Sequence, residues 1–182
     1  MPAPLNTLLR HFWLDADDTR KLIGAPLLER LTRQVAASEQ RHSGEICICV
    51  EASLPLRQLW RVCPALSLAD AVRARAVEMF SQQRVWDTAN NNGVLIYVLL
   101  AEHAIEVVTD RGLSAQVPQA HWASLVARMG EAFKQGNYEA GLTAALADIT
   151  AELVRHFALP AGADMRSASA NPNELPDTPA MR

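Results

Sequence analysis

The segment from Arg84 to Gly112 constrains the fold more than any other part of the sequence. It reads RVWDTANNNGVLIYVLLAEHAIEVVTDRG, in which an asparagine-rich turn leads into a strongly apolar run from Val94 to Leu100. A short break separates this run from a second one, Ile105 to Thr109. Runs of Val, Ile and Leu of this length, bounded by turn residues, are typical of β-strands. The segment therefore predicts two strands joined as a hairpin, with the first strand buried on both faces.

Apolar periodicity predicts the other elements. Helical spacing indicates helices over about 26–41, 68–83, 119–134 and 138–157, and a strand is expected over 45–51. A strand–helix–strand unit favours a right-handed parallel crossover with helices on both faces of the sheet. We therefore expect an α/β fold, a three-layer α/β/α sandwich with a small mixed β-sheet. In the helix at 68–83, spacing predicts an inner stripe of Ala69, Val72, Ala76, Val77 and Phe80.

Size and charge bound the class of protein. The chain has 182 residues and is 49% hydrophobic, enough for one domain over 17–159, with an N-terminal arm over 1–16 and a Pro/Asn-rich tail over 160–182. A net charge of −3 and the absence of a Lys/Arg-rich run argue against nucleic acid as a partner. We expect neither a signal peptide nor membrane insertion, because no apolar run approaches the roughly 20 residues needed to span a bilayer.

The cysteines favour a packing role. Cys47 and Cys49 would point the same way from one strand, and Cys63 makes the number odd. Buried cysteine usually behaves as a small hydrophobe. A soft-metal or redox site is the alternative, although no C-x-x-C motif supports it.

Polar residues are expected at two separate ends of the sheet. If the first two strands are parallel and the third is antiparallel, one end gathers Glu45, Asp87, Asn90, Asn91, Asn92, Asp110 and Arg111. The other end gathers Glu51, Glu102 and His103, together with the Asp15, Asp17 and Asp18 cluster. At about 3.3 Å per strand residue the two groups lie about 20 Å apart, so they cannot form one site.

Each group suggests its own chemistry. The carboxylate and amide oxygens of Glu45, Asp87, Asn91, Asn92 and Asp110 suit a hard cation such as Ca²⁺ or Mg²⁺. Ordinary turn chemistry and a local Asp110–Arg111 ion pair explain the same residues. The imidazole and carboxylates of the second group suit a transition metal or acid–base chemistry, whereas a solvated hairpin tip and a helix cap are the plainer interpretation. The sequence contains no G-x-S-x-G, Gly-rich phosphate loop or H-E-x-x-H motif.

The end of the chain has a composition of its own. Three prolines between Asn171 and Pro179 favour an extended, pre-stiffened conformation with a low ordering cost. Within this segment, Leu175 is the only large apolar residue before Met181. We hypothesise that this peptide docks in a groove of its own domain or of a partner, with Leu175 as the anchor. A solvated tail is the alternative.

Four segments in order resemble the TPM domain family, also described as TPM phosphatases. They are Ser43-Gly44-Glu45-Ile46, Asn92-Gly93-Val94-Leu95-Ile96, the hairpin, and the stretch from Phe133 to Leu142. The resemblance covers roughly 27–157. Without a recognisable anchor, the chain resembles the small cytoplasmic bacterial branch, which implies a cytoplasmic protein that can associate peripherally with the inner membrane.

The resemblance implies several activities. Some members are acid phosphatases, some bind calcium or other divalent ions, and others are accessory proteins associated with membrane TPM or LemA-type proteins. Family members typically carry Asp-Arg at the hairpin tip, where this chain has Glu102-His103, and often Gly-x-Gly after the second strand, where it has Asp110-Arg111-Gly112. We therefore expect a non-catalytic or weakly catalytic accessory module linked to envelope proteins. A metal-dependent phosphatase and a metal-binding module without turnover are the alternatives.

Overall fold

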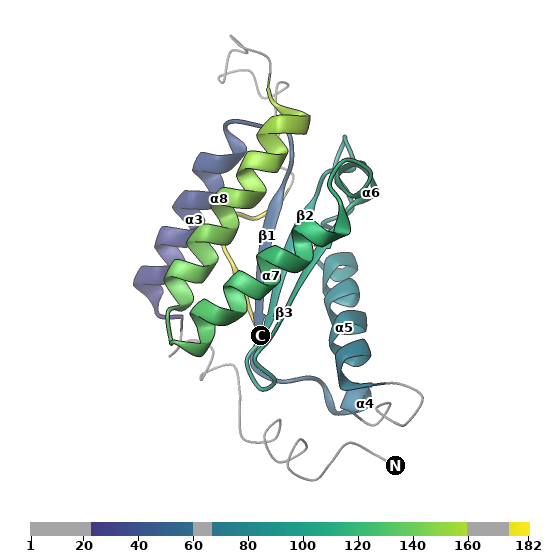
Figure 1. The fold of residues 1–182 in the computed structure, drawn as a ribbon, viewed down its shortest axis with the longest axis vertical. Coiled ribbons are helices and arrows are strands. Elements are labelled where there is room, and N and C mark those ends of the chain that lie inside the picture. Colours follow the sequence, from purple (N-terminus) through teal and green to yellow (C-terminus); the bar gives the residue numbers. More distant parts are fainter. Residues whose placement is uncertain (1–22, 60–66, 160–174) are drawn as a thin grey trace.

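The computed structural model describes residues 23–59, 67–159 and 175–182 (Figure 1). Asp15, Asp17, Asp18 and Cys63, about which the sequence raised expectations, lie outside the described residues. The elements are α3 (Ala25–Glu39), β1 (Ile46–Glu51), α4 (Leu56–Leu59), α5 (Leu68–Gln82), β2 (Val94–Leu99), β3 (Ala104–Thr109), α6 (Arg111–Ser114), α7 (Gln119–Lys134), α8 (Tyr138–Phe157) and β4 (Ala180–Met181).

The strands form one mixed sheet in the order β3-β2-β1-β4. β1 is parallel to β2, with Ile46 opposite Val94 and Glu51 opposite Leu99. β3 returns antiparallel to β2, with Thr109 opposite Val94. The start of β1, the start of β2 and the end of β3 therefore meet at one end of the sheet, as the sequence predicted.

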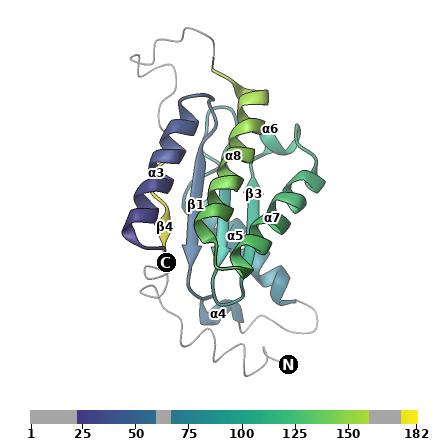
Figure 2. The same ribbon diagram turned by 60° about the vertical axis from the view of Figure 1, so that its left-hand side comes forward.

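Alternating side chains divide the core between the two faces of the sheet. Ile48, Ile96 and Val107 face the layer of α3, α7 and α8, whereas Cys49 and Tyr97 face α5. Figures 1 and 2 show the three helices on one side of the strands and α5 on the other. Since apolar helices bury both faces, every residue of β1 and β2 is buried. The predicted α/β/α sandwich is confirmed.

The predicted inner stripe of α5 is partly wrong. Ala69 is exposed and Val77 is 45% exposed, whereas Arg75 and Met79 are buried. The helix is turned so that Arg75 faces the sheet, because its guanidinium pairs with the buried carboxylate of Glu51. Apolar periodicity alone cannot anticipate a buried charge that is balanced by a partner on another element.

The last residues of the chain pack on the domain. Leu175 is 7% exposed and belongs to the core cluster between the sheet and α5. β4, which the sequence did not predict, pairs in parallel with β1. The Arg182 backbone N–H donates to Val50 O at 2.9 Å, and Ala52 N–H donates to Arg182 O at 2.8 Å. The tail therefore extends the sheet beyond β1.

Candidate cation-binding edge of the sheet

The turn before β2 is shaped by close backbone packing. A Cβ on Gly93 would lie 1.9 Å from Val85 O, so only glycine fits there. Asn91 adopts a left-handed φ of 51°, which asparagine tolerates better than most residues. The Asn92 N–H donates to Thr88 Oγ1 at 3.1 Å. The Asn-rich run is thus a defined turn that presents its amide groups at the start of β2.

The end of β3 is joined to this turn by main-chain hydrogen bonds. Asp110 N–H donates to Gly93 O at 2.9 Å, and Gly112 N–H donates to Asn91 O at 2.8 Å. A Cβ on Gly112 would lie 2.6 Å from both Asn90 O and Asn91 O, so glycine lets these carbonyl groups approach closely. We call residues 87–92 together with 110–112 the polar edge.

Two oxygen atoms of the polar edge are buried without a hydrogen bond. Asn92 is fully buried, and its Nδ2 donates to Ser43 Oγ at 3.1 Å. Asp110 is 7% exposed and caps α6, with Oδ1 accepting from Arg111 N–H at 2.7 Å. Asn92 Oδ1 and Asp110 Oδ2 have no hydrogen-bond partner among the described residues. Leaving such atoms unsatisfied costs free energy, so each needs an explanation.

Arg111 does not compensate the Asp110 carboxylate. Its guanidinium donates to Asn91 Oδ1 at 3.3 Å, and within the described ranges no salt bridge joins Arg111 to Asp110. The local ion pair considered from the sequence is therefore absent between these two described side chains. The buried carboxylate therefore accepts a backbone N–H on Oδ1, and its Oδ2 has no hydrogen-bond partner among the described residues.

The remaining predicted ligands are placed differently. The side chain of Asp87 is exposed at the rim of the turn. Glu45 is buried, and its carbonyl accepts from Val94 N–H at 2.9 Å, but its carboxyl group acts on Glu39 at the end of α3. Burial first, and then the charges of Glu45 and Asp177, raise the pKa of Glu39 to about 8. We therefore centre the candidate site on Asn92 and Asp110.

The donor set is oxygen-rich but holds few charges. Among the described residues, no three carboxylate, imidazole or thiol side chains gather as a metal-ligand group. A cation at the polar edge would take part of its coordination from amide oxygens, main-chain carbonyls and water. Such ligands suit Ca²⁺ or Mg²⁺ rather than a soft metal.

The opposite end of the sheet is internally paired. Arg75 Nη2 donates to Glu51 Oε1 at 2.5 Å, and Tyr97 OH donates to Glu51 Oε2 at 2.6 Å. Burial and the neighbouring Glu51 carboxylate raise the pKa of Tyr97 well above its usual range. Of the predicted second group, His103 is exposed at the hairpin tip with a φ of 49°. We call Glu51, Arg75 and Tyr97 the paired end.

Sequence reasoning missed Arg75 and Tyr97. The available signal was an arginine on the α5 face that carries Ala71, Val72, Ala76 and Met79, and a tyrosine inside an otherwise aliphatic strand. Both placements require a buried partner. Cys47 and Cys49 are buried in the same core layer, and burial raises the pKa of their thiols to about 12 and about 11. Both therefore remain neutral packing residues at physiological pH.

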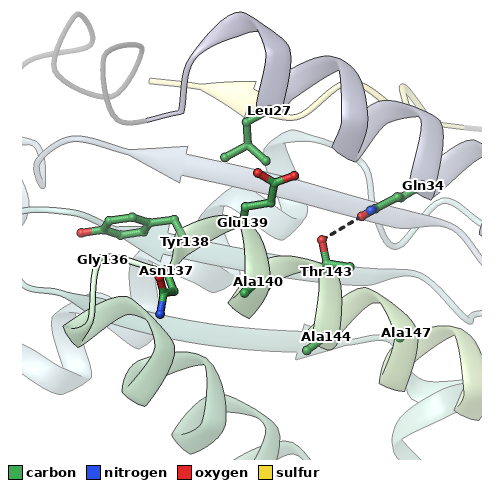
Figure 3. Close-up of a pocket in the computed structure, with 10 residues that line it drawn as sticks. All are labelled: Leu27, Gln34, Gly136, Asn137, Tyr138, Glu139, Ala140, Thr143, Ala144 and Ala147. Carbon is green, nitrogen blue, oxygen red and sulfur yellow. Dashed lines mark hydrogen bonds between the residues drawn. The ribbon is translucent and has the colours of Figure 1, made fainter.

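An open hollow lies between α3 and the start of α8 (Figure 3). Among its lining residues, Thr143 Oγ1 donates to Gln34 Oε1 at 3.2 Å, and Glu139 pairs with the neighbouring Arg30 at 2.5 Å. Much of the remaining wall is made of small side chains, namely Ala140, Ala144 and Ala147. We assign no ligand to this hollow.

The fold and the composition of the edge define an α/β sandwich module, and comparison with known proteins places it in a family. The TPM domain matches residues 17–152. The chain belongs to the TPM domain family. No curated protein matched it. Within the described ranges, none of the helices combines the length and apolarity that a bilayer crossing requires.

Two solved structures share the fold. The BA42 protein from the psychrophilic bacterium Bizionia argentinensis superposes with a TM-score of 0.67 at 23% identity, over 86% of this chain and 92% of that one. The N-terminal domain of a protein from P. gingivalis gives a TM-score of 0.55 at 20% identity, over 75% of this chain and 81% of that one. At these identities the similarity supports the architecture alone.

Proposed function

We propose that this TPM module binds a divalent cation, Ca²⁺ or Mg²⁺, at the polar edge. The observation that carries the proposal is the pair of buried, unbonded oxygens, Asn92 Oδ1 and Asp110 Oδ2. A carboxylate in a buried position is costly unless a positive charge compensates it. A hard cation supplies that charge and uses the oxygen types that this edge presents.

Calorimetry tests the proposal directly. Titrating the full chain with CaCl₂ and MgCl₂ should give a saturable signal with one site, and KCl should give none. Asp110→Ser retains a good N-cap for α6 but removes the carboxylate, so it should abolish the signal while the fold stays intact by circular dichroism. A wild-type protein that gives no saturable heat at millimolar Ca²⁺ or Mg²⁺ would exclude the site.

Phosphatase activity is a separate expectation raised by the family. The same protein should be tested with Mg²⁺, Mn²⁺ and Ca²⁺ against a panel of phosphomonoesters. Cation binding without hydrolysis assigns a binding module. Cation-stimulated hydrolysis that Asp110→Ser removes would assign a metal-dependent phosphatase at the same edge.

A protein-contact role is the second candidate, because Trp86 lies beside the polar edge and is 51% exposed. Exposed aromatic residues are enriched where proteins bind each other. Membrane TPM and LemA-type proteins are the partners that the family resemblance suggests. Co-purification of such a protein at native expression should fall sharply in Trp86→Ala and persist in Trp122→Phe, a conservative change at a buried tryptophan. Equal recovery in all three proteins would contradict a contact at Trp86.

A further inference from the structure

Arg84 occupies a position at the end of α5 that ordinarily favours glycine. Its N–H donates to Ser81 O at 3.1 Å, and the Val85 N–H donates to Phe80 O at 3.0 Å. This pair of hydrogen bonds closes a helix by placing one residue in the left-handed region, where Arg84 has a φ of 56°. Glycine adopts that region freely, whereas a residue with a Cβ is strained there.

The Arg84 side chain makes no contact within the fold that explains this strain. It is exposed, and its guanidinium forms no salt bridge with another described residue. Its positive charge lies at the C-terminal end of α5, where the helix dipole favours it only weakly at the surface. Strained residues that no internal contact explains are concentrated at binding and active sites.

Trp86 and Arg111 lie at the same end of the sheet as Arg84. The turn that carries Arg84 and Trp86 packs on Gly93, where a Cβ would lie 1.9 Å from Val85 O. The Gly93 carbonyl accepts at 2.9 Å from the N–H of the residue directly before Arg111. Arg111 is exposed and Trp86 is 51% exposed. Two exposed cations and one exposed aromatic ring therefore stand on segments that touch each other.

This combination favours an acidic protein segment as the ligand. Arginine binds carboxylates through two parallel hydrogen bonds, tryptophan supplies a large apolar contact, and both residues dominate the binding energy of many protein interfaces. Asp87 is the exposed negative charge of the same turn and opposes such a ligand. A membrane surface fits less well, because Trp86 is the only exposed large apolar side chain of residues 78–112 and two arginines attract anionic lipid weakly.

We propose that Arg84, Trp86 and Arg111 form a docking surface for an acidic segment of a partner protein. The two guanidinium groups pair with carboxylates of the segment, and Trp86 covers a neighbouring apolar side chain. The proposal rests on the protein-contact role proposed above for Trp86 and names the chemistry of the partner, but it requires no bound cation. The strain at Arg84 is then retained for binding rather than for folding.

Fluorescence anisotropy of a labelled peptide measures this binding with the full chain, in buffer freed of divalent cations. The probe is a short peptide of Glu and Asp around a central Leu, and its control carries Gln and Asn in place of the acids. Wild-type protein should bind the acidic peptide saturably and about tenfold or more tighter than the control. Added salt should weaken the binding, because the contacts are exposed ion pairs.

Arg84→Gly separates binding from folding. The change relieves the strained backbone, so the thermal midpoint should stay level or rise, while the affinity for the acidic peptide should fall about tenfold. Arg111→Gln, which keeps a donor for Asn91 Oδ1, should weaken binding to a similar degree. Asp87→Asn should strengthen it, because it removes the opposing charge. Arg33→Ala, an exposed change on α3 at the other face of the sheet, should bind like wild type.

Three results would overturn the docking surface. A lower thermal midpoint in Arg84→Gly would show that this arginine serves folding. Equal binding of the acidic and control peptides would remove the acidic partner, as would binding to vesicles of phosphatidylserine and phosphatidylcholine without binding to the peptide. Loss of binding in Trp86→Ala alone, with both arginine variants like wild type, would remove the acidic partner but leave the contact at Trp86 standing.

Discussion

The two ends of the sheet bury carboxylates and compensate them in opposite ways. At the paired end, Glu51 receives hydrogen bonds from Arg75 and Tyr97, so both of its oxygens are engaged. At the polar edge, Asp110 receives one backbone N–H on Oδ1, and its Oδ2 has no hydrogen-bond partner among the described residues. The same kind of side chain is neutralised by an internal cation at one end and lacks one at the other.

This difference separates a structural site from a ligand site. A buried ion pair that is fully hydrogen-bonded holds two elements together and has no capacity for a further ligand. A buried carboxylate and an unbonded amide oxygen are energetically unfavourable on their own, and a bound cation can compensate both. The comparison therefore supports the proposal of a cation site at the polar edge, whereas the fully bonded groups of the paired end contribute to stability.

The largest expected effect is at the paired end. Glu51→Ala leaves the Arg75 guanidinium buried without its main partner and should reduce the free energy of unfolding by about 3–5 kcal/mol. Urea denaturation measures the loss. The double change Glu51→Leu and Arg75→Met removes both charges and should recover most of it. A loss of less than about 1 kcal/mol in the single variant would contradict a stabilising role of the Glu51–Arg75 ion pair.

At the polar edge, the change in stability caused by a substitution should depend on whether Ca²⁺ is bound. Ca²⁺ at about 100 times its Kd should stabilise the wild-type protein by about 2.7 kcal/mol, and Asp110→Asn should lose this gain while unfolding near the wild-type temperature without Ca²⁺. Asn also caps helices well, so α6 should persist. Thermal unfolding with and without Ca²⁺ measures both quantities. Asp148→Asn, at a half-buried carboxylate on α8 that pairs with Arg128, is the control that should respond to Ca²⁺ like wild type.

Acid should destabilise the protein through a third buried titratable group, the imidazole of His42. His42 is fully buried and bonds to Ser38 Oγ and Gly44 O, and burial lowers its pKa to about 4. The unfolded chain therefore binds this proton first, so stability should fall by up to about 1.4 kcal/mol per pH unit as pH drops from 6.5 towards 4. His42→Gln should flatten this part of the pH profile, whereas the exposed His103→Gln should leave it unchanged.

The smallest expected effect is at Asn92, where one substitution should lower stability without cation but strengthen Ca²⁺ binding. Asn92→Asp adds a second buried carboxylate to the polar edge and should destabilise the protein without cation by about 1 kcal/mol. The added charge should strengthen Ca²⁺ binding, and Ser43 can still donate its hydroxyl proton to the new carboxylate. Chemical denaturation measures the free energy of unfolding without cation, and calorimetry measures the affinity for Ca²⁺. Weaker Ca²⁺ binding in this variant would contradict a cation beside residue 92.

Periodicity was sufficient to predict the long elements and the edge at which the polar residues meet. The bounds of α7 and α8 follow their apolar spacing, and the hairpin follows from two aliphatic runs between turn residues. Topology then dictates that the Asn91–Asn92 turn and Asp110 lie side by side. These inferences succeed because they depend only on local pattern and strand direction.

Features that depend on side-chain partners far apart in sequence were not predictable in the same way. The burial of Arg75 depends on Glu51, 24 residues earlier. β4 depends on an unpaired edge of β1, which no periodicity in the last residues reveals. Within the polar edge, the sequence could not show that Asn91 Oδ1 is bonded by Arg111 while Asn92 Oδ1 is left unbonded. Such choices are made by packing geometry rather than by local propensity.

A Ca²⁺ titration of the full chain followed by amide NMR shows whether, and where, a cation binds. A cation at the polar edge should give saturable shifts of the amides at residues 90–93 and 110–112, absent in Asp110→Asn, with little change around Glu51 and Tyr97. Saturable shifts confined to the Glu51, Glu102 and His103 end, or no saturable shift at the polar edge at millimolar Ca²⁺, would contradict it.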